Sequence, residues 1–317
     1  MKAVVLDSYT LTAGELSWKE LEGLCDVEVY DITSPQDVLE RAKEAEIILT
    51  NKVVLGKNEL KMLPNCRYIG VLATGYNVVD VKDAKDRNIV VTNIPSYSAD
   101  SVAQLVFAFI LDFSFHVAQH SSEVHEGVWC KSRHFCYHSY PLHELNGKTL
   151  GIAGFGEIGS RVASIGSSFG MNVIFYNRSK KDESVCGKAR QVTKGELLTS
   201  SDFLSLSLPL NDESRLFIDE NAISMLKHNS YVINTGRGGL VDEHAMYRAL
   251  KDGRIAGYAT DVLTKEPPDS ECPLLDSSAV ITPHIAWQTY EARHRLMKQA
   301  IENIRAFMDG KPLNRVN

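Results

Sequence analysis

Three side chains in the second half of the chain are suited to acid–base chemistry at a carbonyl group. Arg237 lies between glycines, which leave space for its guanidinium to bind a carboxylate with two parallel hydrogen bonds. Glu266 precedes two prolines, and His284 follows a proline at the end of a predicted strand. Reduction of a carbonyl by a hydride needs a proton donor, a cation that holds the substrate, and a carboxylate that orients the imidazole and favours its charged form. The chain offers one residue of each kind.

Each of these residues also has a purely structural explanation. Arg237 alone is equally well explained by a surface salt bridge. Glu266 alone is most simply a turn residue, and a lone histidine such as His284 at a strand end is more often a hydrogen-bonded cap than a catalyst. The combination of the three favours the catalytic interpretation.

A glycine-rich turn within residues 148 to 161 indicates where a cofactor would bind. Gly154 allows a tight turn after a short apolar strand, Gly156 lets the backbone approach a pyrophosphate, and Gly159 lets the next helix pack closely on the strand. The N-terminus of that helix then faces the anion. A purely structural turn is the weaker alternative, because the strand before the glycines and the amphipathic run after them supply the context of a dinucleotide site.

The end of the next predicted strand bears on the choice between NAD and NADP. An acidic residue there would bind the ribose 2′-hydroxyl and repel a 2′-phosphate, but the chain has Asn177, followed by Arg178 and Ser179. This pattern favours NADP. A solvated basic turn is the alternative, and the nearby Asp182 and Glu183 weaken the case for NADP.

The composition narrows the class of protein. With 317 residues, of which 44% are apolar, the chain is long enough for two domains. A formal charge of −6 and a pI near 5.9 lack the basic field that binding to nucleic acid requires. The longest strongly apolar stretch, residues 105 to 111, is too short to span a bilayer, and the N-terminus does not resemble a signal peptide. We therefore expect a cytoplasmic protein that binds neither nucleic acid nor membrane.

The six cysteines are scattered along the chain without a C-x-x-C pair, so reduced thiols are the simplest interpretation. Potential metal ligands cluster in the segment from Cys130 to His138, which also holds His134 and Cys136. A loop or a pocket lining is the better explanation of this segment, and we expect no metal site.

Alternating apolar runs and helical patterns predict the elements that position these residues. Short strands in the N-terminal third predict one parallel α/β sheet, and strands in the second half predict another. One long helical pattern, from Ser98 to about Glu126, resembles a hinge between them, and a last helix over residues 289 to 308, capped by Thr289 and Gly310, returns to the first domain. Two such domains in tandem place a cleft between them. The predicted strands cover residues 4–6, 27–30, 47–50, 68–72 and 89–91 in the first sheet, and residues 150–153, 172–177, 203–208, 231–235, 257–261 and 280–282 in the second.

A series of short motifs runs through nearly the whole chain. Its members, in order, are Leu72-Ala-Thr-Gly-Tyr-Asn-Val-Val-Asp80, the glycine turn at Gly154, Leu208-Pro209, Asn234-Thr-Gly-Arg237, Asp261-Val-Leu-Thr-Lys-Glu266-Pro267 and Thr282-Pro-His-Ile-Ala286. This series resembles the D-isomer specific 2-hydroxyacid dehydrogenases, and it is far more specific than any one of its members. Within that family, Thr50-Asn-Lys52, Ala99-Asp-Ser-Val-Ala-Gln104 and His284-Ile-Ala-Trp287 are most similar to the glycerate dehydrogenase and hydroxypyruvate reductase branch.

The resemblance implies a fold and a reaction. A flavodoxin-like substrate domain, residues 1–98 with 287–317, would hold an inserted dinucleotide-binding Rossmann domain, residues 99–286, and both would be doubly wound parallel α/β domains. The reaction would transfer a hydride between NADP or NAD and a small 2-keto or D-2-hydroxy acid, with hydroxypyruvate/glycerate or glyoxylate/glycolate as the expected pairs. A homodimer would form through the long helix and the loop after Ser98.

The resemblance also implies residue roles. His284 would be the acid in reduction and the base in oxidation, Glu266 its partner, and Arg237 the anchor for the substrate carboxylate and carbonyl. Backbone amides around Thr74 and Gly75 would hold the other side of the carboxylate, and Lys52 would line the pocket. The expected cofactor contacts are Gly154, Gly156, Glu157, Ile158, Gly159, Asn177, Arg178, Ser179, Leu208, Pro209, Thr235, Gly236 and, at the nicotinamide end, Asp261.

Three residues leave questions open. Trp287 would either narrow the pocket to a short substrate or pack between domains, with equal support for each. Gln104 stands where many members of the family carry Glu, which leaves the catalytic assignment intact. Asn177 stands where the NAD-dependent members carry Asp, which puts a preference for NAD in doubt.

Two other classes of function compete with this interpretation. A nucleotide-sensing binding module of the same fold, such as a corepressor-like protein, would not need the complete set of Arg237, Glu266 and His284. A dehydrogenase of another small anion, such as formate or phosphite, would share the cofactor fold, and the sequence leaves that possibility open.

Overall fold

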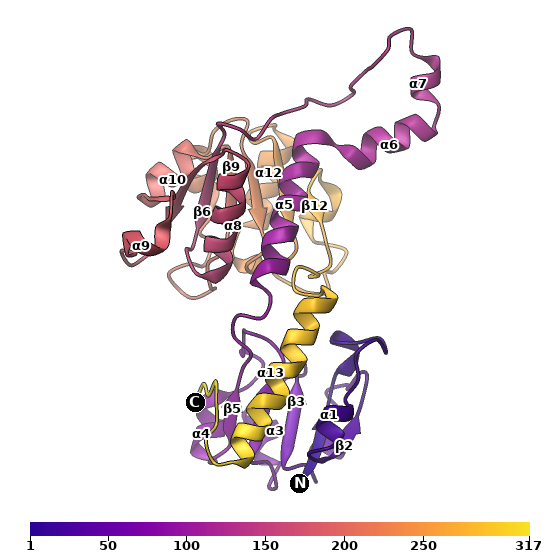
Figure 1. Ribbon diagram of the computed structural model, residues 1–317, viewed down its shortest axis with the longest axis vertical. Coiled ribbons are helices and arrows are strands. Elements are labelled where there is room, and N and C mark those ends of the chain that lie inside the picture. The colour runs from indigo at the N-terminus through magenta and orange to yellow at the C-terminus, as the bar shows by residue number, and fades with distance from the viewer. The chain divides into compact units, whose positions relative to one another are not determined.

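The chain folds into two compact units, one made of residues 1–98 and 288–317 and the other of residues 99–287. The computed structural model describes residues 1–317, apart from the side chains at positions 183 and 185. Each unit is built on its own parallel sheet with helices packed against it (Figure 1). The predicted fold class, two doubly wound α/β domains, is therefore confirmed.

The sheet of the first unit has the strand order β2-β1-β3-β4-β5, and all pairs are parallel. This is the flavodoxin-like order, in which the connections reverse direction between β1 and β3. Ligands of such sheets bind beyond the carboxyl ends of the strands at this point, so the residues after β1 and β3 lie where a ligand would bind. The strands are β1 (Lys2–Val5), β2 (Asp26–Val29), β3 (Ile47–Thr50), β4 (Tyr68–Val71) and β5 (Val90–Thr92).

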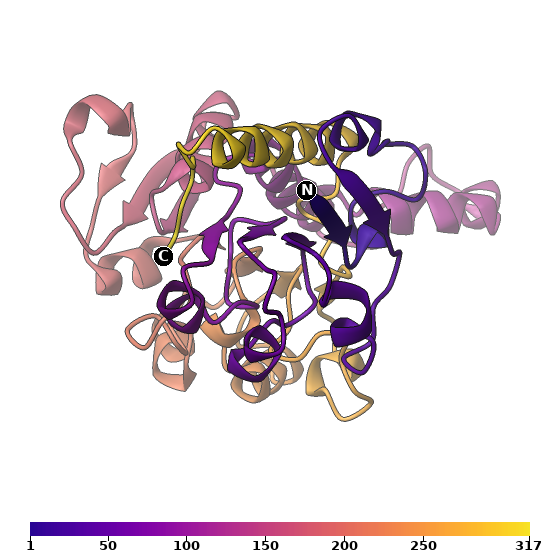
Figure 2. The ribbon, with the colours of Figure 1, turned by 90° about the horizontal axis from the view of Figure 1, so that it is seen from below.

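Helices cover both faces of this sheet. Figure 2 shows α13 (Tyr290–Met308), in yellow, along one face, and short purple helices on the other. The hydroxyl of Thr289 accepts a hydrogen bond from the Ala292 amide at 3.3 Å, and Gly310 follows the helix with a φ of 74°, so both predicted caps are confirmed. The other helices are η1 (Ser8–Thr10), α1 (Lys19–Glu22), α2 (Val38–Ala42), α3 (Lys57–Lys61) and α4 (Val81–Asp86).

The sheet of the second unit has the order β12-β11-β10-β9-β6-β7-β8, again parallel. Counted from β6, this is the dinucleotide-binding order 3-2-1-4-5-6 with one more strand at the edge, and it reverses between β6 and β9. The prediction missed β8, because its two residues carry no apolar pattern. The strands are β6 (Thr149–Ala153), β7 (Asn172–Tyr176), β8 (Arg190–Gln191), β9 (Phe203–Leu206), β10 (Tyr231–Asn234), β11 (Gly257–Thr260) and β12 (Val280–Ile281).

Two apolar cores lie on the two faces of this second sheet. The helices are α5 (Ala99–Phe115), α8 (Glu157–Ser168), α9 (Glu183–Cys186), α10 (Lys194–Ser200), α11 (Glu220–Met225), η2 (Gly238–Leu240), α12 (Glu243–Lys251) and η3 (Pro273–Asp276). Phe203 and Ile233 pack in the core that includes α5 and α8, whereas their neighbours Leu204 and Val232 pack in the core with α10, α11 and α12. Successive strand residues thus face opposite sides, which explains why these strands are continuous apolar runs.

The helical pattern after Ser98 is interrupted, so the prediction of one helix over residues 98 to 126 was wrong. Helix α5 ends before His116, whose backbone is left-handed with a φ of 47°, and α6 (Val117–His125) continues at an angle of 53°. A left-handed residue cannot continue a right-handed helix. Helices α6 and α7 (Val128–Lys131) project from the rest of the second unit (Figure 1). Within the described chain, no single helix is long and apolar enough to cross a membrane, although α5 and α6 pass this test when taken together.

Candidate active site

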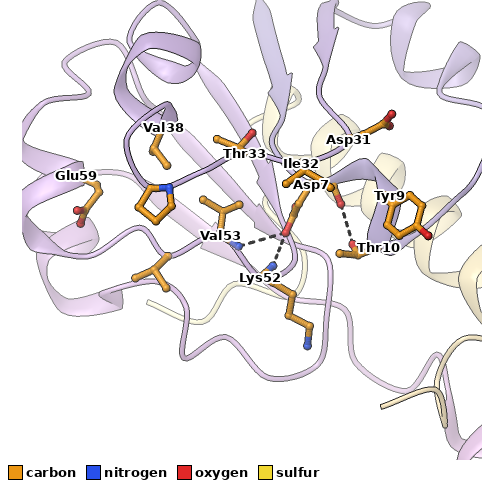
Figure 3. Close-up of a pocket in the computed structure, with 12 residues that line it drawn as sticks. Asp7, Tyr9, Thr10, Asp31, Ile32, Thr33, Val38, Lys52, Val53 and Glu59 are labelled. Atoms are coloured by element: carbon orange, nitrogen blue, oxygen red, sulfur yellow. Dashed lines mark hydrogen bonds between the residues drawn. The ribbon is translucent and has the colours of Figure 1, made fainter. Parts of the chain in front are cut away.

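The residues of the first unit that were predicted to bind the substrate follow β3 and β4. Lys52 is exposed in the turn after β3, and Figure 3 shows it among the residues that line a cavity of about 390 Å³. Thr74 and Gly75 follow β4, and the Thr74 hydroxyl donates to the Ile94 carbonyl at 2.9 Å. Over the residues that the structure describes, neither the Thr74 nor the Gly75 amide donates a hydrogen bond. Both amides are therefore available to an anion.

The glycine-rich turn of the second unit joins β6 to α8. Gly154 has a φ of 95°, which favours glycine, and a Cβ there would lie 2.6 Å from the Ser207 carbonyl oxygen. A Cβ at Gly159 would lie 2.1 Å from the Gly154 carbonyl oxygen, so α8 packs as closely as glycine allows. Gly156 caps the helix and has open space beside its Cα. These are the conformations that a pyrophosphate-binding turn requires.

Buried hydroxyl groups near this turn fit a cofactor at the point where the strand order reverses. Ser207 and Thr235 follow β9 and β10, and their hydroxyl oxygens are buried without a hydrogen-bond partner in the described part of the chain. Buried polar groups without partners are rare in folded proteins, and they mark places where a ligand or an ordered water completes the hydrogen bonds. Thr235 was predicted, whereas Ser207 was missed because a serine after an apolar strand matches no motif.

The predicted loops next to these hydroxyls also meet. Leu208 and Pro209 follow Ser207 directly, and a Cβ at Gly236 would lie 3.3 Å from the Leu208 carbonyl oxygen. The expected contacts of the β9 and β10 loops are therefore neighbours at one edge of the sheet.

The residues after β7 form a hydrogen-bonded loop. Asn177 Oδ1 accepts a hydrogen bond from the Phe155 amide at 3.3 Å. Asn177 Nδ2 donates to the carbonyl and hydroxyl oxygens of Ser179 at 3.0 and 3.1 Å. The asparagine that replaces the expected acidic residue thus links the glycine turn to the loop of Arg178 and Ser179.

Arg178 already has an anionic partner. Its guanidinium lies 2.7 Å from the Glu213 carboxylate, and both side chains are mostly exposed. The sequence interpretation missed Glu213 because it stands 35 residues later in the chain. Asp182, expected to oppose NADP, caps α9 by accepting a hydrogen bond from the Ser184 amide at 2.8 Å. The side chain of Glu183 lies outside the described residues.

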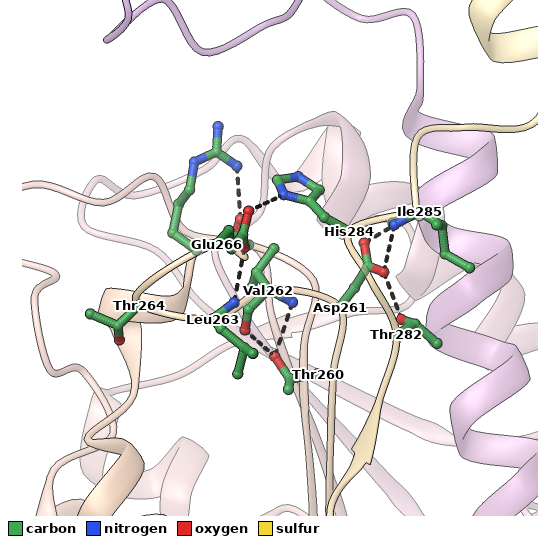
Figure 4. Close-up of polar contacts among 12 residues, drawn as sticks. Thr260, Asp261, Val262, Leu263, Thr264, Glu266, Thr282, His284 and Ile285 are labelled. Atoms are coloured by element: carbon green, nitrogen blue, oxygen red, sulfur yellow. Dashed lines mark hydrogen bonds and ion pairs between the residues drawn. The ribbon is translucent and has the colours of Figure 1, made fainter. Parts of the chain in front are cut away.

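His284 and Glu266 form a hydrogen-bonded pair beyond β11 and β12, as Figure 4 shows. His284 Nδ1 lies 2.6 Å from Glu266 Oε2, and Oε1 of the same carboxylate accepts a hydrogen bond from the Leu263 amide at 2.9 Å. The two side chains are 26% and 35% exposed. Because Nδ1 is engaged, Nε2 is the imidazole nitrogen that can exchange a proton with a substrate.

A buried carboxylate holds the turn that carries His284. Asp261 follows β11, is 1% exposed, and accepts hydrogen bonds from the Ile285 and Ala286 amides, both at 2.8 Å. The Thr282 hydroxyl donates a third at 2.6 Å. His284 itself has a φ of 56°, which is unfavourable for residues other than glycine, so its turn needs this support. Burial raises the pKa of Asp261, and the three hydrogen bonds oppose that rise. The expected contact of Asp261 with nicotinamide stays a prediction.

Arg237 is exposed at the turn after β10. The buried side chain of Asn234 fixes this turn, because its Nδ2 donates to the Arg237 carbonyl at 3.0 Å and its Oδ1 accepts from the Gly236 amide at 3.1 Å. A Cβ at Gly238 would lie 2.0 Å from the carbonyl carbon of Leu263, so the turn packs directly on the segment after β11. The structure thus brings all three catalytic candidates to the same edge of the second sheet.

The remaining predictions have mixed outcomes. Trp287 is buried, which fits either of its two interpretations, and Gln104 is exposed on α5. The segment from Cys130 to His138 is mostly exposed, and all six cysteines are free thiols. Among the described residues, no group of three or more His, Cys, Asp or Glu side chains could hold a metal ion.

Comparison with known proteins gives matches over the second unit and over the whole chain. Residues 107–286 match the family model described as "D-isomer specific 2-hydroxyacid dehydrogenase, NAD binding domain". A hydroxypyruvate reductase from Blautia hydrogenotrophica is 40% identical, and the match covers 100% of this chain and 100% of the relative. A glycerate dehydrogenase from Methylorubrum extorquens is 36% identical over 99% of this chain and 98% of its own.

A solved structure is similar over the same extent. An acyclic imino acid reductase in complex with NADPH and D-Arg matches with a TM-score of 0.88 and 31% identity, over 100% of both chains. The resemblance predicted from the motifs, including its glycerate dehydrogenase and hydroxypyruvate reductase branch, is confirmed by these matches.

Proposed function

The chain belongs to the D-isomer specific 2-hydroxyacid dehydrogenase family, and we propose that it reduces a short 2-keto acid, hydroxypyruvate or glyoxylate, to the corresponding 2-hydroxy acid. Family membership makes it an oxidoreductase with a nicotinamide cofactor. The names of its relatives, hydroxypyruvate reductase and glycerate dehydrogenase, support the substrate class. The observation that carries the chemistry is the 2.6 Å contact between His284 and Glu266 beyond the carboxyl ends of the second sheet.

His284 is the proposed proton donor. Its Nε2 gives a proton to the carbonyl oxygen in reduction and takes one back in oxidation. Glu266 supports the charged imidazole, because its carboxylate accepts the hydrogen bond of Nδ1. The bound nicotinamide supplies the hydride in reduction.

Arg237 is the proposed anchor of the substrate. Its planar guanidinium binds a carboxylate with two parallel hydrogen bonds, and the neighbouring glycines leave its exposed side chain room to do so. The unused amides of Thr74 and Gly75 and the cation of Lys52 are further candidates for binding the carboxylate. A keto acid offers the anionic group that all of these residues are suited to hold.

The glycine turn at Gly154 and the hydroxyls of Ser207 and Thr235 would hold the dinucleotide. We propose that NADPH is preferred, because Asn177 carries no charge that would repel a 2′-phosphate and Arg178 stands next to it. The imino acid reductase with 31% identity was solved with NADPH. The ion pair of Arg178 with Glu213 opposes this preference, since the phosphate must compete with the carboxylate.

A homodimer is proposed through α6, α7 and the loop that follows them. Val117, Trp129 and Phe135 on this segment are 67%, 49% and 92% exposed. Large apolar side chains gathered on one exposed segment are typical of protein interfaces. Light scattering at micromolar concentration should give twice the chain mass, whereas a mass near 35.2 kDa would contradict the proposal. A cytoplasmic location stays a prediction.

The substrate is tested by measuring NADPH and NADH oxidation against hydroxypyruvate, glyoxylate, pyruvate and bulkier keto acids. We expect the highest kcat/KM with hydroxypyruvate or glyoxylate, and His284→Ala serves as the blank. A clear preference for a bulkier keto acid would refute the substrate proposal while leaving the family unchanged. If the wild-type protein reduces none of these keto acids, the proposed reaction itself is refuted.

A further inference from the structure

A second buried carboxylate, in the first unit, is hydrogen-bonded to the turn that carries Lys52. Asp7 follows β1 and is 5% exposed. Its Oδ1 and Oδ2 accept hydrogen bonds from the Asn51 amide at 2.8 and 3.1 Å. Its Oδ2 also accepts from the Lys52 amide at 2.5 Å and from the Val53 amide at 3.2 Å (Figure 3). One carboxylate therefore binds three consecutive backbone amides of the turn after β3.

Side-chain hydrogen bonds also hold the same turn. The Asn51 Nδ2 donates to the Thr10 hydroxyl oxygen at 2.9 Å, and that hydroxyl donates to the carbonyl oxygen of Asp7 at 2.8 Å. The end of β1 and the turn after β3 thus form one hydrogen-bonded block at the point where the strand order reverses. The backbone of Lys52 has little freedom within this block.

A charged group is a costly way to satisfy these amides. Burial raises the pKa of Asp7, while the hydrogen bonds from the Lys52, Asn51 and Val53 amides oppose that rise. A neutral acceptor would avoid much of the cost of removing a charge from water. What the carboxylate adds is two oxygens that bind three donors at once, and this fixes the turn more firmly than a neutral acceptor could.

The fixed turn also forms part of a cavity wall. Asp7, Lys52 and Val53 line the cavity of about 390 Å³, together with Tyr9 and Thr10 from the segment after β1. Movement of the turn would displace the Lys52 side chain and this wall together.

We propose that Asp7 is a positioning residue for substrate binding: it holds the turn after β3 so that Lys52 presents its ammonium group to the keto acid. The inference rests on the proposed function, in which Lys52 contacts the substrate. Asp7 itself acts through the turn and does not touch the reacting atoms.

The test is a double-mutant cycle of Asp7→Asn and Lys52→Met in the full-length protein. Asp7→Asn keeps the size of the side chain but leaves one of its two end atoms unable to accept, so we expect the keto-acid KM to rise about tenfold, the scale of a lost hydrogen bond to a charged group. The kcat and the cofactor Kd should change little, because the glycine turn and His284 belong to the second unit. In the Lys52→Met background, Asp7→Asn should have almost no further effect on KM.

A matched control and a second variant keep the result interpretable. Asp31→Asn changes an exposed carboxylate that lines the same cavity, and it should leave KM unchanged. Thr10→Val removes only the hydrogen bonds of the Thr10 hydroxyl, so it should also raise KM, by a smaller factor. This variant tests the turn even if Asp7→Asn does not fold. The cofactor Kd and thermal unfolding report whether each variant is folded.

Two results would overturn the inference. If Asp7→Asn raises KM by the same factor with Lys52 present and with Met in its place, Asp7 does not act through Lys52. If KM is unchanged in both folded Asp7→Asn and Thr10→Val, the turn has no role in binding. A wild-type protein without activity on any keto acid would instead refute the proposed function on which the inference rests.

Discussion

The turn that carries His284 leads to a prediction that separates two roles of one residue. Asp261→Asn keeps the shape of the side chain, but only one of its two end atoms can still accept the hydrogen bonds of Ile285 and Ala286. A buried amide left without an acceptor costs about 1 to 3 kcal/mol. This energy lowers the equilibrium constant for the active conformation of the turn by roughly fivefold to 150-fold. Because His284 needs a left-handed backbone, we expect kcat for keto-acid reduction to fall by roughly that factor.

Steady-state kinetics at saturating cofactor and a fluorescence titration of NADPH together measure both roles. If Asp261 only holds the turn, kcat falls while the cofactor Kd is unchanged. The matched control is Asp219→Asn, which changes the cap of α11, where the side chain accepts from the Ala222 amide at 2.7 Å. Asparagine is an equally good cap, so this control should behave as the wild type. Wild-type kcat in Asp261→Asn would refute the argument, and a raised Kd with wild-type kcat would assign Asp261 to the nicotinamide.

Three further changes test the site. His284→Ala should lower the rate of keto-acid reduction by roughly a hundredfold to ten-thousandfold, with cofactor binding retained in the same titration; near-normal turnover would end the proposed mechanism. Arg237→Lys keeps the charge but loses the two parallel hydrogen bonds, so the keto-acid KM should rise about tenfold to a hundredfold; an unchanged KM would pass the anchoring role to another residue, such as Lys52. Glu213→Gln frees Arg178 and should raise the ratio of kcat/KM for NADPH over NADH by up to about fivefold, the range of an exposed ion pair; a wild type that favours NADH, with a ratio that Glu213→Gln does not alter, would show that Arg178 does not bind the phosphate.

Most strands could be predicted because helices cover both faces of each sheet, which makes a buried strand a continuous apolar run. In β3 every residue is buried, and its predicted and observed ends agree. The exceptions have physical reasons. Strand β8 is two residues long and includes an exposed Arg190, so no pattern marks it. The break at His116 depends on one left-handed backbone conformation, while the residues around it keep a helical pattern.

The site residues differ in how local their signals are. Gly154 and Gly159 belong to one short motif, in which spacing alone defines the turn and the close packing of the helix. The contacts that hold Lys52 and His284 are not local. Asp7 lies 44 residues before the first amide that it binds, and Asp261 lies 24 residues before Ile285. No pattern within one element reports such contacts. The sequence therefore identified the functional side chains but not the aspartates that hold their turns in place.

In both units the turn that carries a functional side chain is held by the same geometry. Asp7 and Asp261 each stand just beyond the end of a buried strand, and each binds amides just beyond the neighbouring parallel strand, β3 in one unit and β12 in the other. Parallel neighbours end at the same edge of a sheet, and the amides of the turn that follows have no strand partner there. Buried amides must be paired, so an acidic residue after one strand satisfies the turn after the next and fixes it. In this chain an aspartate within two residues of the end of a buried parallel strand thus holds the turn that follows the adjacent strand, and those two turns carry Lys52 and His284.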